Sequence, residues 1–239
     1  MAPLSARRAG KPDLVGPAVA VGIFLLYQAT FSSVPTSDAL TYSRFIDSGE
    51  HSRILFPNAM LTSYTFFQLK RLLIGVGFTP PTLELIRAVN ALSAALSGLL
   101  FYRTVLLLGG GPFWGAVGAG LLAGSYGFWY FANGEMHHLA MVFVLLVFYL
   151  LLRRRMLDAP ITPAFVCGVA LLNVAAGFFH QEHFLFGLSA VALLMVGRPW
   201  RQGARDATLY TGAGIAGSVA VVLTMGAGVL GLRSLDAIR

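Results

Sequence analysis

Residues 83–108 read LELIRAVNALSAALSGLLFYRTVLLL, an apolar run whose few charges, Glu84, Arg87 and Arg103, lie toward its two ends. A helix needs about 20 apolar residues to cross the hydrocarbon core of a bilayer. Similar runs recur along the chain, which has 239 residues, 56% of them hydrophobic and only 11% charged. Soluble domains average about 25% charged residues, and the mean hydropathy here is +0.73. The sequence therefore predicts an all-α integral membrane protein.

Further spans are expected on both sides of this run. Residues 161–196 form one long apolar stretch, which His180-Gln181-Glu182-His183 divides into two short spans joined by a tight turn. The other apolar segments are 14–31, 113–131, 139–152 and 207–230. Together with 83–108 they predict about seven transmembrane helices.

Segment 54–78 is also long enough to span, but it carries Lys70 and Arg71. Each charge near the bilayer centre costs roughly 2.5–3.5 kcal/mol. If the segment does not cross, all later basic loops lie on the cytoplasmic side with the amino terminus, as the positive-inside rule requires. The residues concerned are Arg7, Arg8, Lys11, Arg103, Arg153, Arg154, Arg155, Arg198, Arg201 and Arg205. We therefore expect 54–78 to be an interfacial juxtamembrane helix on the outer side.

The expected organisation is a basic cytoplasmic N-terminus (1–13), one transmembrane domain (14–231) with an outer loop at 32–82, and a short outer tail (232–239). The formal charge of +7 follows from these loops and does not indicate a nucleic-acid partner. The single cysteine, Cys167, excludes an internal disulfide. Richness in Ala, Gly and Arg favours a bacterial source, and hence a multi-pass protein of the plasma (inner) membrane.

This topology gathers acidic and histidine side chains on the outer side. The residues are Asp38, Asp47, Glu50, Glu135, Glu182 and the five histidines, His51, His137, His138, His180 and His183. Carboxylate and imidazole groups perform acid–base chemistry near neutral pH and also bind metals. If the stretch around Asp38 is helical, Asp38, Tyr42 and Phe45 share one face. Asp38 is then either a general base at the membrane surface or, like Ser37, a helix cap.

Other groups on the outer side leave their roles open. Glu135, His137 and His138 are either a polar turn or part of a site, whereas His180 and Glu182 join two short spans and are expected near headgroup depth. His-Gln-Glu-His lacks the spacing of a zinc-protease helix, so the metal is unknown and a divalent ion remains an alternative. Cations could anchor in headgroups or hold a phosphate: Arg44, Arg53, Lys70, Arg71 and Arg87. Small residues could mark close helix packing: Gly120, Gly124, Gly212, Gly214 and Gly217.

The order of these elements resembles the GT-C class of membrane glycosyltransferases, which includes protein O-mannosyltransferases and lipid A aminoarabinose transferases. The resemblance covers roughly residues 7–200: the Asp38 loop, Leu55-Phe56-Pro57-Asn58, and the segments 85–92, 124–135 and 149–153. Two departures stand out. His137-His138 follows the acidic turn, where relatives often place tyrosine, and the sequence ends soon after the seventh expected span, as a truncated relative would.

The resemblance implies transfer of a sugar from a polyprenyl-phosphate carrier, with membrane lipid as the surrounding partner. It implies catalytic roles for Asp38 as base, Glu135 in orienting the sugar, and His180 beside the departing phosphate. Substrate-binding residues would be Tyr42, Arg53, Lys70, His137 and Glu182. Two alternatives remain open: a metal-dependent membrane enzyme that uses the histidines with Glu182, and a noncatalytic assembly subunit.

Overall fold

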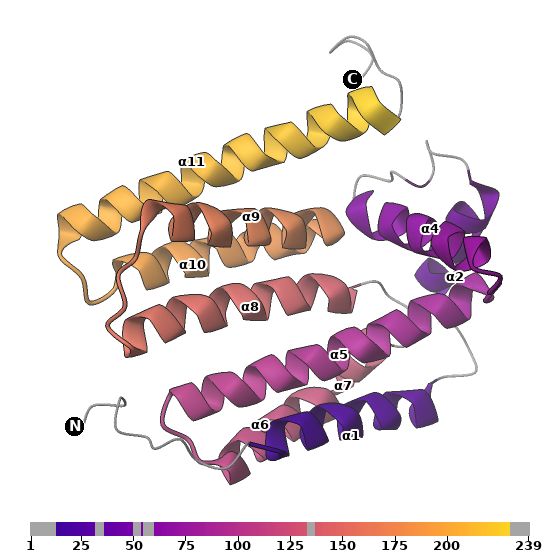
Figure 1. Ribbon diagram of the computed structural model, residues 1–239, viewed down its shortest axis with the longest axis horizontal. Coiled ribbons are helices and arrows are strands. Elements are labelled where there is room, and N and C mark those ends of the chain that lie inside the picture. Colours follow the sequence, from indigo (N-terminus) through magenta and orange to yellow (C-terminus); the bar gives the residue numbers. More distant parts are fainter. Residues whose placement is uncertain (1–12, 32–35, 50–53, 55–59, 133–136, 230–239) are drawn as a thin grey trace.

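The computed structural model describes residues 13–31, 36–49, 54, 60–132 and 137–229 (Figure 1). Within these ranges the regular structure is entirely helical and contains no strand, which confirms the predicted all-α class. Several predictions fall outside them: the N-terminus, Arg53, the 55–58 element, Glu135 and the tail. Of His137 only the backbone is described.

The chain begins with α1 (Val15–Thr30), and two helices, α2 (Ser37–Ser48) and α4 (Met60–Gly75), occupy the predicted outer loop. The next elements are α5 (Thr82–Leu107), α6 (Pro112–Gly124), α7 (Tyr126–Ala132) and α8 (His137–Met156). They are followed by α9 (Pro163–Phe179), the 3-10 helix η3 (Gln181–Leu185), α10 (Phe186–Met195), α11 (Trp200–Thr224) and the π-helical turn η4 (Met225–Val229).

Among the described residues, two helices are long and apolar enough to cross a membrane by length and composition, Thr82–Leu107 and Trp200–Ala227. The other apolar helices are shorter; α1, for example, has 16 residues, or roughly 24 Å at 1.5 Å per residue. The number of spans therefore stays a prediction. The segment 113–131, expected as one span, is instead two helices, because Ser125 adopts an extended backbone (φ −66°, ψ 137°) between α6 and α7. By contrast, α8 extends the short predicted span 139–152 at both ends.

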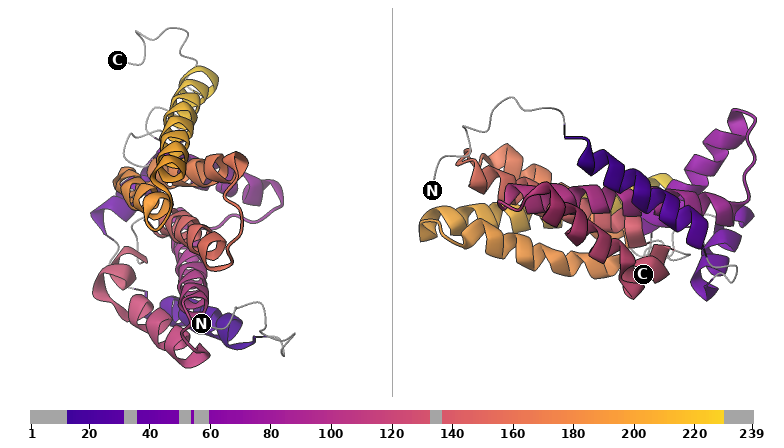
Figure 2. Two further views of the ribbon diagram at one scale, coloured as in Figure 1. Left: turned by 90° about the vertical axis from the view of Figure 1, so that its left-hand side faces the viewer. Right: turned by 90° about the horizontal axis from the view of Figure 1, so that it is seen from below.

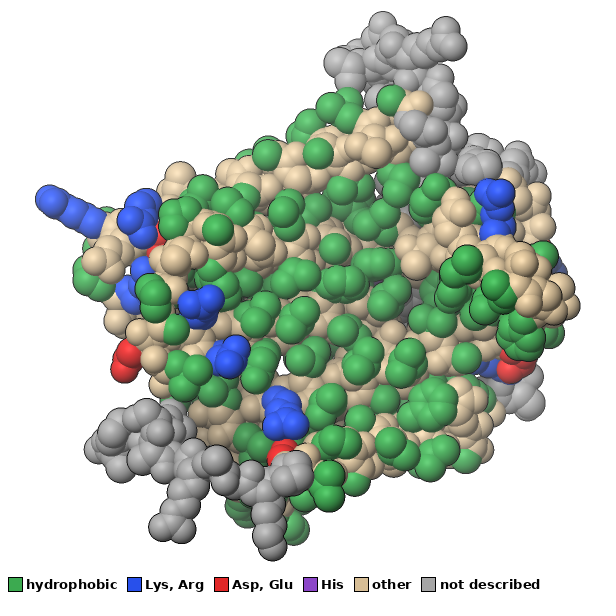
Figure 3. Space-filling view, viewed as in Figure 1, with side chains coloured by type: hydrophobic (Ala, Val, Ile, Leu, Met, Phe, Trp, Pro, Cys, Tyr) green, Lys and Arg blue, Asp and Glu red, His purple; other side chains and the backbone are tan. Residues whose placement is uncertain are grey.

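The long helices run roughly side by side, with α2 and α4 at one end of the bundle (Figures 1 and 2). Helix α5 lies at the centre and packs against α1, α6 and α8, whereas α9 links α8 to α11. Because successive helices reverse direction, one end collects Arg103, Arg153–Arg155, Arg198, Arg201 and Arg205, and we call it the arginine end. Figure 3 shows basic side chains gathered over that end, on the left of the view. The opposite end holds His138, His180 and His183 and is called the histidine end.

Specific polar contacts fix the helices to one another. The Tyr27 hydroxyl donates to the Ala123 carbonyl at 2.6 Å, and the Tyr102 hydroxyl donates to Asp13 at 3.0 Å. The close-packing role predicted for the glycines is wrong for Gly120, Gly124, Gly212 and Gly214, since a β-carbon at each would meet open space. Only Gly217 of that set packs closely, against Leu171 of α9.

Candidate functional site

The turn between α9 and α10 lies at the histidine end of the bundle. His180 ends α9 in an extended conformation (φ −158°, ψ 124°), and the His183 amide donates to the His180 carbonyl at 3.0 Å to begin η3. Gly177 permits the tight return, because a β-carbon there would lie 2.5 Å from the Phe184 ring. The predicted tight turn at 180–183 is thus present, and it brings His180 and His183 within 6.0 Å, measured between ring centroids.

Three imidazoles lie in a series at this end, two from the turn and one from α8. His138, at the start of α8, is buried, and its Nε2 lies 2.8 Å from the Phe128 carbonyl oxygen. His183 is also buried, stacks on Phe186 at 5.7 Å between centroids, and lies near enough to His138 for their charges to interact. His180 is half-buried at the surface end of the series. The sequence predicted these residues on one face, but no spacing indicated that α8 and η3 would bring them together.

Asp38 lies in the first turn of α2, exposed to solvent. The helix is capped by Thr36, whose hydroxyl oxygen accepts from the Ala39 amide at 3.1 Å. The capping alternative for Ser37 and Asp38 is therefore wrong: a threonine one residue earlier in the sequence holds that position. The carboxylate of Asp38 lies in the first turn, where its negative charge interacts favourably with the helix dipole, but it does not provide the cap.

Asp38 and Glu182 both act on His180 through their charges. Burial lowers the pKa of His180 below its ordinary value, and the negative charges of Glu182 and Asp38 oppose this without reversing it. The imidazole is therefore neutral near pH 7. A neutral His180 cannot supply the positive charge expected beside a departing phosphate, but it can donate a hydrogen bond or exchange a proton. Asp38, His180 and Glu182, which come from separate parts of the sequence, thus lie in one electrostatic neighbourhood.

Lys70 is committed to partners within the protein. Its ammonium pairs with Asp47 of α2 and donates to the Thr82 hydroxyl of α5 at 2.6 Å, and Thr82 donates to the same carboxylate. Burial alone would raise the pKa of Asp47, but the hydrogen bonds from Lys70 and Thr82 and the Lys70 charge hold it below its usual value. This network joins α2, α4 and α5, so Lys70 serves structure in this arrangement. Neither partner was predicted, because Asp47 and Thr82 lie far from Lys70 in sequence.

Apolar contacts hold α4 and α2 over the site. Phe66, Ile46, Leu85 and Ile86 form a buried cluster, against which Tyr42 packs half-buried. The Thr62 hydroxyl donates to the Phe179 carbonyl, immediately before His180. Helix α4 is therefore attached to the turn that carries the histidines.

Arg87 is the most enclosed of the described cations at the histidine end. Its side chain is only 11% exposed, pairs with Glu84 at 3.0 Å and lies over the Phe31 ring at 5.7 Å. Arg71 packs over Phe67 on the surface of α4. These contacts orient both guanidinium groups at the histidine end.

No group of three or more metal-binding side chains occurs within the described residues. Glu135 and the side chain of His137, which were part of the predicted cluster, lie outside them. A cavity of about 500 Å³ lies instead at the arginine end, away from the histidines.

A scan against protein-family models and searches of curated proteins and of solved structures find no significant match to this chain.

Proposed function

We propose that this protein is a membrane glycosyltransferase that moves a sugar from a polyprenyl-phosphate carrier to an acceptor at the extracytoplasmic face. In this proposal seven helical segments cross the plasma membrane. The arginine end faces the cytoplasm, and α2 and α4 lie in the outer interface. The observation that carries the proposal is the position of Asp38, an exposed carboxylate beside a half-buried neutral His180, at the end of the bundle opposite the arginine end.

The chemistry requires a base for the acceptor and stabilisation for the leaving group. Asp38 takes the proton of the acceptor hydroxyl while its oxygen attacks the anomeric carbon, and the bond from that carbon to the carrier phosphate breaks. The released negative charge stays on the lipid phosphate, where positioned donors stabilise it. Neutral His180 donates a hydrogen bond, and Arg87 and Arg53 supply positive charge. Glu182 orients the sugar hydroxyls and Tyr42 lines the sugar site, and the resemblance assigns like roles to Glu135 and His137, whose side chains lie outside the described residues.

The arrangement of α4 supports an interfacial site. Helix α4 is attached to both α2 and the His180 turn. It would therefore hold Asp38 of α2 at headgroup depth, where the carrier phosphate of a polyprenyl lipid lies. Lys70 contributes indirectly, because its contacts to Asp47 and Thr82 fix α2 on α5.

Mass spectrometry of envelope glycans and lipids tests the proposal in a deletion strain complemented with wild-type protein or with the Asp38→Asn variant. We expect one sugar modification to be lost on deletion and restored only by the wild type, with both proteins present in the membrane. Identical profiles in all strains would contradict the proposal. Stoichiometric zinc or iron in the purified protein would then favour the metal-dependent enzyme, and a stable co-purifying subunit would favour the assembly role.

A further inference from the structure

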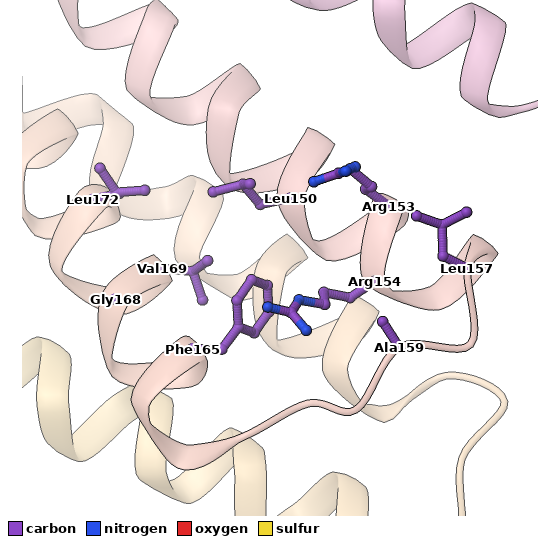
Figure 4. Close-up of a pocket in the computed structure, with 9 residues that line it drawn as sticks. All are labelled: Leu150, Arg153, Arg154, Leu157, Ala159, Phe165, Gly168, Val169 and Leu172. Carbon is purple, nitrogen blue, oxygen red and sulfur yellow. The ribbon is translucent and has the colours of Figure 1, made fainter. Parts of the chain in front are cut away.

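The cavity at the arginine end lies between α8 and α9 and is amphipathic. Its volume of about 500 Å³ is within the range of small-molecule sites. Leu150, Val169 and Leu172 form its apolar part, whereas Arg153 and Arg154 project from the last turns of α8 near its rim (Figure 4). None of the residues that line it is acidic. The surface therefore combines an apolar groove with positive charge at one end only.

The two rim arginines differ in how they are held. Arg154 lies over the Phe165 ring at 4.9 Å and donates to the Pro160 carbonyl at 3.2 Å, so its guanidinium is fixed in place. Arg153 is exposed and forms no hydrogen bond or ion pair with any residue in the described ranges. Its charge is available to a ligand.

The neighbouring Arg155 and Arg198, by contrast, form contacts between helices. Arg155 donates to the Leu193 carbonyl at 3.0 Å, and Arg198 donates to the Leu194 carbonyl and pairs with buried Asp206 at 2.8 Å. These side chains join α8, α10 and α11. Of the arginines of α8, Arg153 is therefore the one whose guanidinium is exposed at the mouth of the groove without a partner in the described ranges.

We propose that this groove binds one anionic phospholipid of the cytoplasmic leaflet. An acyl chain lies along Leu150, Val169 and Leu172, and the phosphate lies at Arg153 with Arg154 behind it. Basic pockets between helices on the cytoplasmic side favour such headgroups, and arginine binds phosphate through two parallel hydrogen bonds. The inference rests on the membrane placement proposed above, but not on glycosyl transfer.

Native mass spectrometry of the delipidated full chain in detergent tests the inference, with phosphatidylglycerol and phosphatidylcholine added separately. We expect one phosphatidylglycerol to be retained in preference to phosphatidylcholine. Arg153→Ala should weaken that binding about fivefold, the effect of losing one basic side chain at a lipid surface. Arg201→Ala is the matched control, because it removes the same charge from an exposed position at the same end, outside the groove.

A second variant tests the apolar part without changing charge. A β-carbon at Gly168, which lines the groove, meets nothing within 4 Å, so Gly168→Leu should fill the groove without disturbing the helices and should reduce retention. Gly120→Leu, equally open but on α6, should have no effect. Equal binding of both lipids, equal losses in Arg153→Ala and Arg201→Ala, or full retention in Gly168→Leu would overturn the inference. A protein that binds phosphatidylglycerol selectively but transfers no sugar would support the lipid-binding inference while contradicting the proposed function.

Discussion

The two ends of the bundle use charge in different ways. At the arginine end, Asp206 is 1% exposed and pairs with Arg198 and Arg205, and Asp13 pairs with Arg103 at 3.3 Å while it accepts from Tyr102. At the histidine end, Asp38 is exposed and forms no hydrogen bond or ion pair with the part of the chain that the structure describes. Asp206 and Asp13 thus join helices at the first end, as Asp47 does at the second, whereas Asp38 is left available beside an imidazole.

This contrast separates residues that stabilise from residues that could react. A buried charge is tolerated when it is paired and hydrogen-bonded, which is the state of Asp206. A carboxylate without a partner in the described residues, as Asp38 is, keeps its oxygens available to accept a proton or a hydrogen bond from a ligand.

Chemical labelling should separate the two ends completely. In a Cys167→Ser background, Ser37→Cys on α2 and Gln202→Cys on α11 each place a thiol at an exposed position, one at each end. A membrane-impermeant maleimide should modify only Ser37→Cys in intact cells, and should modify Gln202→Cys only after permeabilisation. The reverse pattern would invert the proposed orientation, and labelling of both in intact cells would contradict the membrane placement.

Removal of a carboxylate should destabilise the arginine end more than the histidine end. Asp206→Asn leaves Arg198, whose side chain is only 16% exposed, without its buried charge partner, so the free energy of unfolding should fall by about 3 kcal/mol. Asp47→Asn breaks a pair whose carboxylate side chain is 51% exposed, so the loss should be below about 1 kcal/mol. Unfolding titrations in mixed micelles, followed by circular dichroism, measure both. Equal losses would remove the distinction between a buried and a surface pair.

Substitution of two glycines of α6 by alanine should change the free energy of unfolding in opposite directions. A β-carbon at Gly115 would lie 2.7 Å from the ring of Tyr102, which is buried and tied to Asp13, so Gly115→Ala should cost about 1–3 kcal/mol. At Gly120 the space is open, and Gly120→Ala should stabilise by up to about 1 kcal/mol through helix propensity. The same unfolding titration measures both changes, and a loss of stability in Gly120→Ala would contradict the packing described.

The smallest expected effect concerns the titration of His180. The Asp38 charge raises its pKa against the larger effect of burial, so Asp38→Asn should move the pKa further below the ordinary value. Nitrogen NMR of ring-labelled histidines, assigned with His180→Gln, measures this shift. Asp158→Asn, at the other end of the bundle, should leave it unchanged. An unchanged pKa in Asp38→Asn would mean that the two groups are not neighbours.

Hydrophobic runs and charge bias predicted the all-helical class, a helix within 54–78 and the 180–183 turn, and the placement of that helix on the outer side stays a prediction. These patterns did not predict the break at Ser125, although Gly124 and Ser125 form a Gly/Ser pair of the kind at which helices kink, because the hydrophobicity of 113–131 is continuous across it. The cap at Thr36 was missed because several adjacent polar residues could cap equally well. The Lys70 pairing and the approach of His138 to His183 join residues distant in sequence. Periodicity within one segment does not report such contacts.

The most direct test of the central claim is the rate of sugar transfer by purified protein in vesicles, for Asp38→Asn and Asp158→Asn side by side. The two substitutions make the same chemical change at opposite ends, and asparagine tolerates the left-handed backbone of Asp158 (φ 47°). We predict that Asp38→Asn lowers the rate by about 10²–10⁴-fold, while Asp158→Asn retains the wild-type rate. Equal rates in the two variants would contradict the claim that the histidine end carries the chemistry.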